Sequence, residues 1–345
     1  MWIAGCGFKE RRDFRSASRN RHAPSDDNTR QRLYLVTRHL ITIFMPVRLL
    51  ALDLDGTLLN SLGELSPRNC AAIGEARAAG VRVALVTGRR FRDARPLALQ
   101  LGLDVPVISH NGALTKHART LETVAVNLLP LETAREVLRV GRTHRADPLV
   151  SADHEGAGLL VYDHLRDTAG PVAEYIAWSR RIHGDEAERA ILHVPSLEDY
   201  LRHAPVHITF SGAYADIKRL SLVFDDALGA SVKLMTTLYP HIDFGLIDVI
   251  HPDVSKGTGL AAVAAEYHIS PAEVMAVGDN HNDVEMLEFA GTRVAVANAE
   301  PRVRDLAGIH ITATNDDDGV AVAIEKFILA ETSDRNSEDR IQHTE

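Results

Sequence analysis

The stretch Asp53-Leu54-Asp55-Gly56-Thr57-Leu58 follows an apolar run over residues 47–52 that a single arginine interrupts. Such a run predicts a buried strand, and because alternate side chains of a strand point the same way, Asp53 and Asp55 should face one side. In open α/β sheets, ligands bind outside the carboxyl ends of the strands. Gly56 allows a tight turn at that point. The stretch therefore predicts a ligand-binding strand end.

Two carboxylates so close in a chain repel each other unless a cation lies between them or one of them is protonated. Both arrangements suit phosphoryl transfer. A hard divalent ion such as Mg²⁺ takes oxygen ligands, and a protonated carboxyl can donate to a leaving oxygen. The same stretch also fits a strand end capped by solvated acids ahead of a turn, so the rest of the chain has to decide between the two interpretations.

Beyond this stretch, short apolar runs alternate with amphipathic segments, which is typical of a parallel sheet with crossover helices. Strands are predicted at residues 47–54, 81–86, 105–109, 274–277 and 294–296. Helices are predicted at residues 66–79, 255–267, 282–289 and 318–329. In the first helix Ser66 is the expected N-cap, Pro67 occupies the first helical position, and Gly80 ends the helix. The predicted fold class is α/β.

The alternation changes between residues 128 and 245, where we predict strands and helices of an α+β domain. Its strands are expected at residues 207–211 and 231–236, and its helices at residues 131–142 and 215–225. We interpret this segment as a domain inserted into a core built from residues 45–127 and 246–330. A chain of 345 residues exceeds the usual size of one domain, which agrees with two. Residues 331–345 are expected to form a polar tail.

The first 44 residues have a different composition, with nine Lys or Arg and four Asp or Glu, although the whole chain carries a net charge of −9. A basic segment of this kind can be a transit peptide, a tail for an acidic partner, or an extension upstream of the natural start. The acids Glu10, Asp13, Asp26 and Asp27 argue against a transit peptide. Since Met45 directly precedes the first strand, we expect residues 1–44 to be disordered or to lie outside the native protein.

Charge and composition exclude several classes of protein. A pI of about 6.0 argues against a general nucleic-acid binder, which needs surplus cations to displace counterions from phosphates. The longest apolar run, residues 40–54, contains a proline and two charged residues and falls short of the roughly 18 residues of a membrane span. Cys6 and Cys70 form no CxxC pair, so neither a disulfide framework nor a zinc site is predicted. We expect a cytoplasmic protein, with Cys70 as a small core residue.

Two further segments carry groups that can hold a phosphate. In Val86-Thr87-Gly88-Arg89, which follows a predicted strand, Thr87 offers a hydroxyl and Gly88 an accessible backbone N–H. Lys256 lies at the expected start of a helix, where the helix dipole already favours anions. No glycine-rich run with Walker spacing precedes this lysine, so it is not a P-loop lysine. Alone, each segment also fits a common turn or a surface lysine.

The fourth segment is Gly278-Asp279-Asn280-His281-Asn282-Asp283, which follows the strand predicted at residues 274–277. Asp279 and Asp283 are four residues apart, so a helix that opens at this turn would place both on one face near its positive end. Two carboxylates there suit a metal ligand and a residue that supports it. The alternative is an acidic first turn that only caps a helix.

In this order the four segments resemble the haloacid dehalogenase superfamily, and the inserted domain looks like the large cap of its Cof-type, or class IIB, members. The likeness covers about residues 46–329. The pair Asn111-Gly112 also matches that group, in which this asparagine lies near the active site. The resemblance implies a Rossmann-like parallel sheet core with an α+β cap, and a phosphatase that acts on a small phosphorylated metabolite.

The resemblance also implies roles for single residues. Asp53 would be the nucleophile that becomes an aspartyl-phosphate, and Asp55 the acid that protonates the leaving alcohol and then activates water. Mg²⁺ would be held by the Asp53 carboxylate, the Asp55 backbone carbonyl and Asp279. Residues with supporting roles would hold the phosphoryl group (Thr87, Gly88, Lys256), lie close to the substrate (Arg89, Asn111) or support the metal ligands (Asn282, Asp283).

Other functions remain open at this stage. A phosphotransferase or phosphomutase of the same fold would need the same residues, and only the fate of the phosphate separates it from a hydrolase. A non-catalytic regulator would be expected to lack Asp53 or Asp279, and a dehalogenase would have no task for Asp55 and a metal site. The cap sequence does not identify the substrate. Sugar phosphates, nucleotides and phosphorylated cofactors such as pyridoxal phosphate or flavin mononucleotide all fit.

Overall fold

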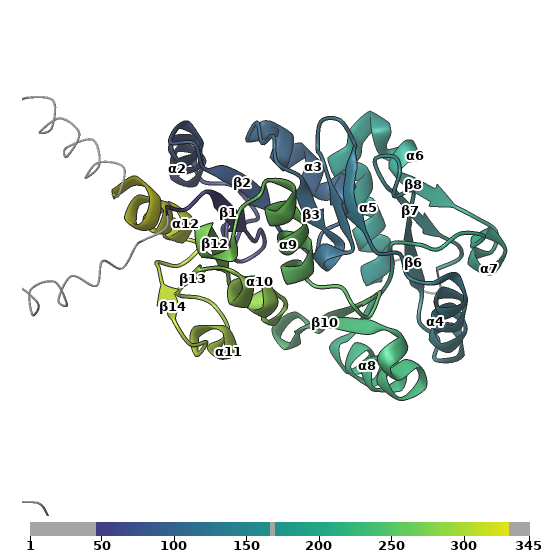
Figure 1. Cartoon of the computed structure of the whole chain (residues 1–345). Coiled ribbons are helices and arrows are strands. Elements are labelled where there is room, and N and C mark those ends of the chain that lie inside the picture. Colours follow the sequence, from purple (N-terminus) through teal and green to yellow (C-terminus); the bar gives the residue numbers. More distant parts are fainter. Residues whose placement is uncertain (1–45, 166–169, 331–345) are drawn as a thin grey trace, which may run out of the picture. The chain divides into compact units, whose positions relative to one another are not determined.

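The computed structural model describes residues 46–165 and 170–330, and their strands form three sheets. The predictions for residues 1–44 and for the tail at 331–345 lie outside the described residues. In Figure 1 the five-stranded sheet and its helices form one group of elements, and the six-stranded sheet with its helices forms another. Among the described residues, no helix is long and apolar enough to cross a membrane.

The five-stranded sheet is parallel throughout, with the order β14-β13-β12-β1-β2. Its strands are β1 (Leu49–Leu52), β2 (Arg82–Leu85), β12 (Val274–Gly278), β13 (Thr292–Ala295) and β14 (Ile309–Ile311). All four residues of β1 are buried, because this interior strand is covered on both faces. The predicted α/β class with a parallel, Rossmann-like sheet is therefore confirmed, and the first strand pairs directly with a strand from the far end of the chain.

The helices of this core include four close to the predicted positions and two, at residues 91–100 and 301–304, that were not predicted. They are α2 (Pro67–Ala78), α3 (Phe91–Gln100), α9 (Lys256–Glu266), α10 (Val284–Phe289), α11 (Pro301–Arg304) and α12 (Gly319–Ile324), which continues into a short π-helix, η7 (Glu325–Leu329). Ser66 caps α2 by accepting a hydrogen bond from the Asn69 backbone N–H at 3.1 Å. Cys70 was predicted to be a core residue, but it is exposed, because the buried face of α2 is formed by Asn69, Ala72, Ile73 and Ala76.

The inserted domain contains a six-stranded sheet in the order β10-β11-β9-β6-β7-β8. The strands are β6 (Pro148–Ala152), β7 (Leu159–Tyr162), β8 (Ile191–His193), β9 (His207–Gly212), β10 (Lys233–Tyr239) and β11 (Phe244–Ile250). Its helices are α4 (Leu131–Thr143), α5 (Pro171–His183), α6 (Ala187–Ala190), α7 (Leu197–Tyr200) and α8 (Tyr214–Leu228). Side chains of α4, α8 and the sheet share one apolar core, in which the rings of Phe210 and Phe224 lie 5.1 Å apart. This domain is α+β, as predicted.

Two predictions about the sheets need correction. The strand expected at residues 105–109 forms β3 (Val107–Ser109), which pairs antiparallel with β4 (Leu114–Lys116) in a separate small sheet that β5 (Thr123–Val126) completes. An isolated bridge between Val86 and Ile108 links β3 to the strand end after β2. The predicted boundary at residue 245 is also wrong for the sheet, because the ladder between β10 and β11 continues as far as the pair Lys233 and Ile250.

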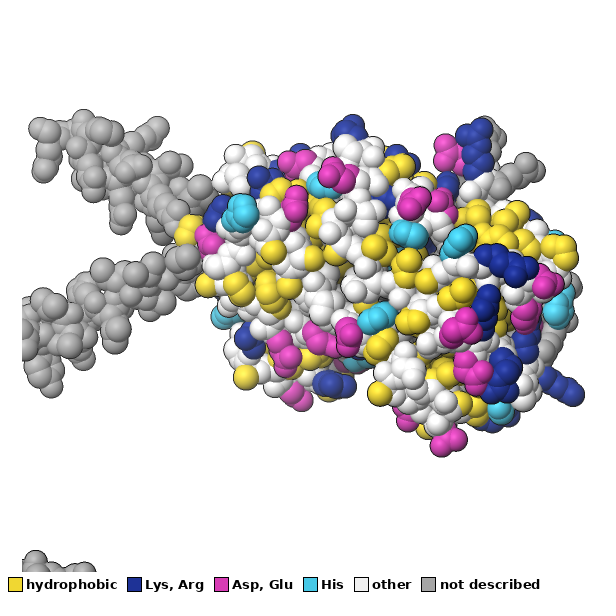
Figure 2. Space-filling model, turned by 45° about the vertical axis from the view of Figure 1, so that its right-hand side comes forward, with side chains coloured by type: hydrophobic (Ala, Val, Ile, Leu, Met, Phe, Trp, Pro, Cys, Tyr) yellow, Lys and Arg dark blue, Asp and Glu magenta, His cyan; other side chains and the backbone are white. Residues whose placement is uncertain are grey.

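The surface mixes charges of both signs. On the face shown in Figure 2, acidic and basic side chains lie interspersed, with apolar and histidine side chains between them. On α4, for example, Arg135 pairs with Glu132 and Arg139 pairs with Glu136, each three residues apart. Exposed pairs of this kind contribute little to stability, because solvent screens the two charges. They solvate the helix and do not determine the fold.

Candidate active site

Asp53 and Asp55, which the sequence placed on one side of a strand, have different surroundings. Asp53 follows β1 directly, its backbone N–H donates to the Val277 carbonyl at 3.1 Å, and only 4% of the residue is exposed. Asp55 lies farther out, with 58% of its side chain exposed. Arg89 donates to both oxygens of Asp55, at 2.8 and 2.6 Å. The two carboxylates are therefore separated by their partners, one toward the interior and one toward solvent.

Lys256 joins two buried carboxylates. Its Nζ donates to Asp53 Oδ1 and to Asp283 Oδ1, both at 2.6 Å. Burial alone would lower the pKa of Lys256, but the charges of Asp283 and Asp53 outweigh it and raise the pKa above its ordinary value. The lysine therefore carries its charge in the interior, where an unpaired ammonium would be costly.

The local sequence holds Lys256 in this position. Ser255 caps α9 by accepting from the Thr258 N–H at 3.1 Å, and the Thr258 hydroxyl accepts from the Ser255 N–H at 3.0 Å. This reciprocal capping box makes Lys256 the first residue of the helix. Gly112 packs against the same point, since a Cβ at this glycine would lie 2.0 Å from the Ser255 carbonyl oxygen. The glycine of the predicted Asn111-Gly112 pair thus lets the chain approach the start of α9.

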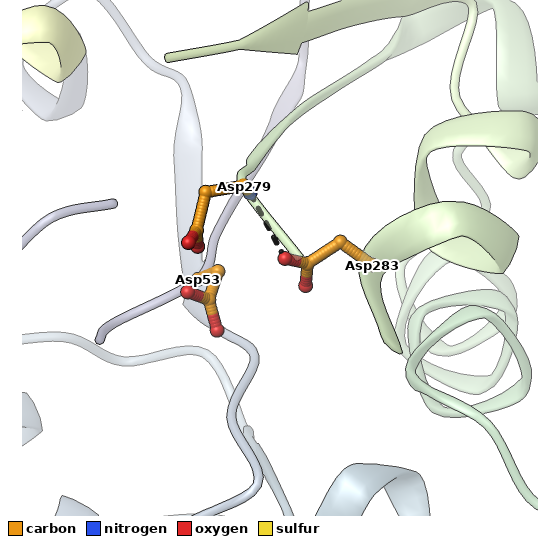
Figure 3. A group of neighbouring side chains, drawn as sticks. All are labelled: Asp53, Asp279 and Asp283. Atoms are coloured by element: carbon orange, nitrogen blue, oxygen red, sulfur yellow. Dashed lines mark hydrogen bonds between the residues drawn. The ribbon is translucent and has the colours of Figure 1, made fainter. Parts of the chain in front are cut away.

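Asp53, Asp279 and Asp283 form a cluster in which one oxygen of each lies within 4.8 Å of the others (Figure 3). Burial, followed by the charge of Asp283, raises the pKa of Asp53 well above its ordinary value. The same two causes, in the same order, raise the pKa of Asp279 to about 6. Hard oxygen donors that repel one another are the donor set that a divalent cation such as Mg²⁺ prefers. The cluster therefore fits a divalent metal ion.

The three carboxylates are not equivalent, because Asp283 already has hydrogen bonds to both oxygens. Its Oδ2 accepts from the backbone N–H groups of Asp279 and Asn280, each at 3.0 Å, while its Oδ1 accepts from Lys256. Figure 3 shows the first of these bonds as a dashed line. Asp279 receives a hydrogen bond at 2.8 Å from the hydroxyl of Thr57, within the motif after β1. The arrangement suits Asp53 and Asp279 as ligands and Asp283 as their support.

The predicted phosphate-holding segment lies beside this cluster. Thr87 is buried, and its hydroxyl accepts from the Arg89 backbone N–H at 3.0 Å. A Cβ at Gly88 would lie 3.1 Å from Asn111 Oδ1, so the glycine leaves room for that amide. Asn111 Oδ1 also accepts from Asn282 Nδ2 at 2.9 Å, which links this segment to the turn that carries Asp283.

A cavity of about 400 Å³ opens over these groups. It is lined on the core side by eight of the predicted site residues, namely Asp53, Asp55, Thr87, Gly88, Arg89, Asn111, Lys256 and Asn282. Asp279 and Asp283 do not line it but belong to the carboxylate cluster behind it. The opposite wall comes from the inserted domain, whose contributions include His207, Thr209, Tyr239, Phe244 and Asp248. The structure thus brings all ten predicted residues to one place.

Buried polar contacts hold the inserted domain against the core. Lys116 on β4 donates to three consecutive carbonyls of the loop between β6 and β7, those of His154, Glu155 and Gly156, at 2.6, 2.6 and 2.7 Å. Arg90 forms a buried ion pair with Asp93 and also donates to the hydroxyls of Tyr175 and Ser179 on α5, at 3.0 and 2.8 Å. These contacts explain why one cavity has walls from both domains.

The sequence analysis did not predict which residues of the inserted domain form the cavity wall. Asp248 on β11 is its most informative residue, because it is buried and lines the cavity. Burial raises the pKa of Asp248 to about 6, partly offset by a hydrogen bond from the Thr209 hydroxyl. The available signal was a lone aspartate in the apolar run of residues 244–250, at the same strand parity as Phe244 and Leu246.

Comparison with known proteins identifies a family and relatives that this chain resembles in sequence. A model of the haloacid dehalogenase-like hydrolase family matches residues 50–324. Pyridoxal phosphate phosphatase YbhA of Escherichia coli (strain K12) is 29% identical over 287 residues, covering 83% of this chain and 100% of YbhA. The phosphatase YitU of Bacillus subtilis (strain 168), named for 5-amino-6-(5-phospho-D-ribitylamino)uracil, is 26% identical over 295 residues, covering 81% of this chain and 97% of YitU.

A solved structure agrees with these matches. The crystal structure of a haloacid dehalogenase-like hydrolase from Bacteroides thetaiotaomicron is similar with a TM-score of 0.67 at 25% identity. The match covers 81% of this chain and 99% of that one. The similarity therefore includes the core sheet and the inserted domain together.

Proposed function

Because this chain belongs to the haloacid dehalogenase-like hydrolase family and is a Cof-type phosphoric monoester hydrolase, we propose that it hydrolyses a small organic phosphate ester through Asp53 with the help of Mg²⁺. The observation that carries the proposal is the Asp53 carboxylate, which lines the cavity, pairs with Lys256 at 2.6 Å and belongs to the carboxylate cluster. This geometry supports the proposal, because the carboxylate of the proposed nucleophile lies beside a cation and a candidate metal site.

Each reacting group has a defined task in the proposed sequence. An oxygen of Asp53 attacks phosphorus, the ester P–O bond breaks, and Asp55 gives its proton to the leaving alkoxide. Asp55 then takes a proton from water, whose oxygen attacks the aspartyl-phosphate, and the Asp53 carboxylate and inorganic phosphate are released. For the first step Asp55 has to loosen its two contacts with Arg89, which frees that guanidinium to face the substrate.

The remaining residues position the phosphoryl group. Lys256 and the Thr87–Gly88 segment lie at the cavity wall and offer the ammonium, the hydroxyl and a backbone N–H. Asp53, Asp279 and the backbone carbonyl of Asp55 would hold Mg²⁺, with Asn282 and Asp283 in support. Bound there, the ion neutralises charge and orients the phosphoryl oxygens.

The substrate is proposed as a small phosphorylated metabolite. YbhA and YitU are named for a phosphorylated cofactor and for a phosphorylated ribityl compound, and the cavity of about 400 Å³ falls within the usual size of small-molecule sites. Sugar phosphates, nucleotides and phosphorylated cofactors are the classes to test.

The test is the release of inorganic phosphate from a panel of phosphomonoesters with Mg²⁺ and with excess chelator. We expect phosphate to accumulate with Mg²⁺ and the rate to collapse with chelator, because Asp53, Asp279 and the substrate would crowd negative charge. Full activity in chelator would contradict the metal assignment. Transfer of the phosphoryl group to an added alcohol, without free phosphate, would instead identify a phosphotransferase.

A further inference from the structure

Two buried histidines meet where the inserted domain contacts the core. His110, which follows β3 in the core, and His207, the first residue of β9, have ring centroids 4.6 Å apart and edge-to-face. Their Nδ1 atoms lie 3.3 Å apart. Burial lowers the pKa of His207 to about 3 and that of His110 well below its ordinary value, with a smaller effect of the Arg90 charge on each. Both rings are therefore neutral at pH 7.

The direction of the hydrogen bonds through these rings follows from one backbone group. The Phe91 N–H can only donate, and it lies 3.2 Å from His110 Nε2, so this nitrogen accepts. A neutral His110 then has its proton on Nδ1 and donates it to Nδ1 of His207. His207 in turn has its proton on Nε2, which lies 3.2 Å from the Thr209 hydroxyl oxygen.

The chain of hydrogen bonds ends on Asp248. Because the Thr209 hydroxyl accepts from His207, its single proton is available for Asp248 Oδ1, at 2.6 Å. On the other side, Asn111 Nδ2 lies 3.5 Å from Asp248 Oδ2. Among the residues that the structure describes, no Lys or Arg forms an ion pair with Asp248. Among the described residues, this buried carboxylate is thus held by neutral donors, and it keeps acceptor capacity at the cavity that Asp248 lines.

We propose, building on the phosphatase function above, that Asp248 recognises hydroxyl groups of the leaving group and that the substrate is the phosphate ester of a polyol or sugar. A carboxylate in this wall needs further donors, since its desolvation is incompletely offset. Hydroxyl groups of a substrate can donate to Asp248. They can also accept hydrogen bonds from the hydroxyls of Ser211 and Thr237 in the same wall. Ser211 Oγ is buried and has no partner among the described residues.

The position of Asn111 places the recognised hydroxyl close to the ester. Its Nδ2 faces Asp248 while its Oδ1 lies beside Gly88, the predicted phosphate-holding residue. A hydroxyl that reaches Asp248 is therefore carried by a carbon near the phosphorylated one. Thr209, His207 and His110 act as positioning residues, because they direct a proton toward Asp248 and keep it an acceptor.

The first test compares substrates that differ only in hydroxyls. We expect the kcat/KM ratio between glycerol 1-phosphate and n-propyl phosphate to be high for the unmodified protein and to fall about 10- to 100-fold in Asp248→Asn, as for loss of a hydrogen bond to a charged group. An unchanged ratio, or an equal loss on both substrates, would overturn the proposal. Loss of all activity on both esters, with glycerol 1-phosphate untouched by the unmodified protein, would point instead to failure of the phosphatase function.

A second pair of substrates separates hydroxyl from ammonium recognition, which a carboxylate also allows. The unmodified protein should prefer 2-hydroxyethyl phosphate to 2-aminoethyl phosphate. A preference for the amine that disappears in Asp248→Asn would overturn the assignment of hydroxyls.

The positioning role is tested at Thr209 with two variants of similar size. Thr209→Val removes the hydroxyl that connects His207 and Asp248, whereas Thr209→Ser keeps it. We expect the valine variant to raise KM for glycerol 1-phosphate several-fold and to lower the substrate ratio, and the serine variant to keep the ratio of the unmodified protein. Equal ratios in both variants would show that the directed hydrogen bonds do not position Asp248. This pair also decides the matter if Asp248→Asn does not fold.

Discussion

Lys256 and Asp53 form an ion pair with 2.6 Å between Nζ and Oδ1, although 203 residues separate them in the chain. Both side chains are almost completely buried, and Asp283 completes a triad around the same ammonium. The pair joins the first strand of the core to the helix that follows the inserted domain. The proposed nucleophile is therefore held in place by a contact that forms only when these two distant segments pack together.

Removal of this ammonium should cost stability as well as activity. Lys256→Met leaves two buried carboxylates without their cation, and we expect the free energy of unfolding to fall by about 3–5 kcal/mol in urea titrations. The control is Lys233→Met, which breaks the partly exposed pair with Glu285 at 2.7 Å and should cost no more than about 1 kcal/mol. Similar losses in the two variants would show that the buried triad has no special role.

Asp53→Asn and Asp55→Asn should fail at different steps. The first variant has no anionic nucleophile and should never form a phosphoenzyme. The second keeps the nucleophile but lacks the proton donor and the later base, so its rate on an alkyl phosphate should fall by a factor of about 10² to 10⁴ and less on an activated aryl phosphate. Mass spectrometry should find phosphate on the Asp53 peptide of Asp55→Asn only. A label on histidine or serine would contradict the covalent aspartate mechanism.

Two glycines near the strand end allow backbone strain to be separated from crowding of the metal site. Gly56 and Gly63 both have positive φ, +85° and +76°. A Cβ at Gly56 would lie 2.5 Å from Asp279 Oδ2, whereas a Cβ at Gly63 would meet nothing within 4 Å. Both alanine variants should lose about 1–2 kcal/mol of stability through strain.

Only Gly56→Ala should also displace Asp279, so we expect it to need a higher Mg²⁺ concentration for half-maximal phosphate release. An equal Mg²⁺ requirement in Gly56→Ala and Gly63→Ala would remove Asp279 from the proposed ligands.

The buried histidine pair predicts an acid-sensitive contribution to stability. His207 has a pKa of about 3 in the folded protein against 6.5 as its ordinary value, so below pH 6.5 the unfolded chain binds more protons and stability falls toward pH 3. At pH 5 the loss is on the order of 2 kcal/mol. Asp248 acts in the opposite direction, because its pKa of about 6 lies above the ordinary 3.8 and its folded form gains protons first.

The histidine effect is therefore measured as a difference between two proteins. His207→Asn should lose stability relative to the unmodified protein at pH 7.5 and recover part of that difference as the pH is lowered to 5, in urea unfolding at each pH. A difference that does not change with pH would show that His207 titrates normally.

Local signals made most helices and strands of the core predictable, whereas α3, α11 and β14 were not predicted. Ser66 and Pro67 begin α2 by capping and by proline geometry, and the capping box of Ser255 begins α9. The exposure of Cys70 was not predictable, since one residue on a weakly amphipathic helix faces inward or outward by a rotation that only the neighbouring elements determine. No strand was predicted at β11, which the structure pairs with β10 as far as Lys233 and Ile250.

By itself, the sequence determined the parallel α/β core, the inserted α+β domain and the groups expected around Asp53, because each of these groups follows a strand or begins a helix in a short recognisable segment. Tertiary structure alone decided that Asp55 pairs with Arg89, that Lys256 bridges Asp53 and Asp283, and that Asp248 faces the cavity. These relationships join segments far apart in the chain. Distance, burial and the direction of a hydrogen bond arise only when these segments pack together, and no local pattern encodes them.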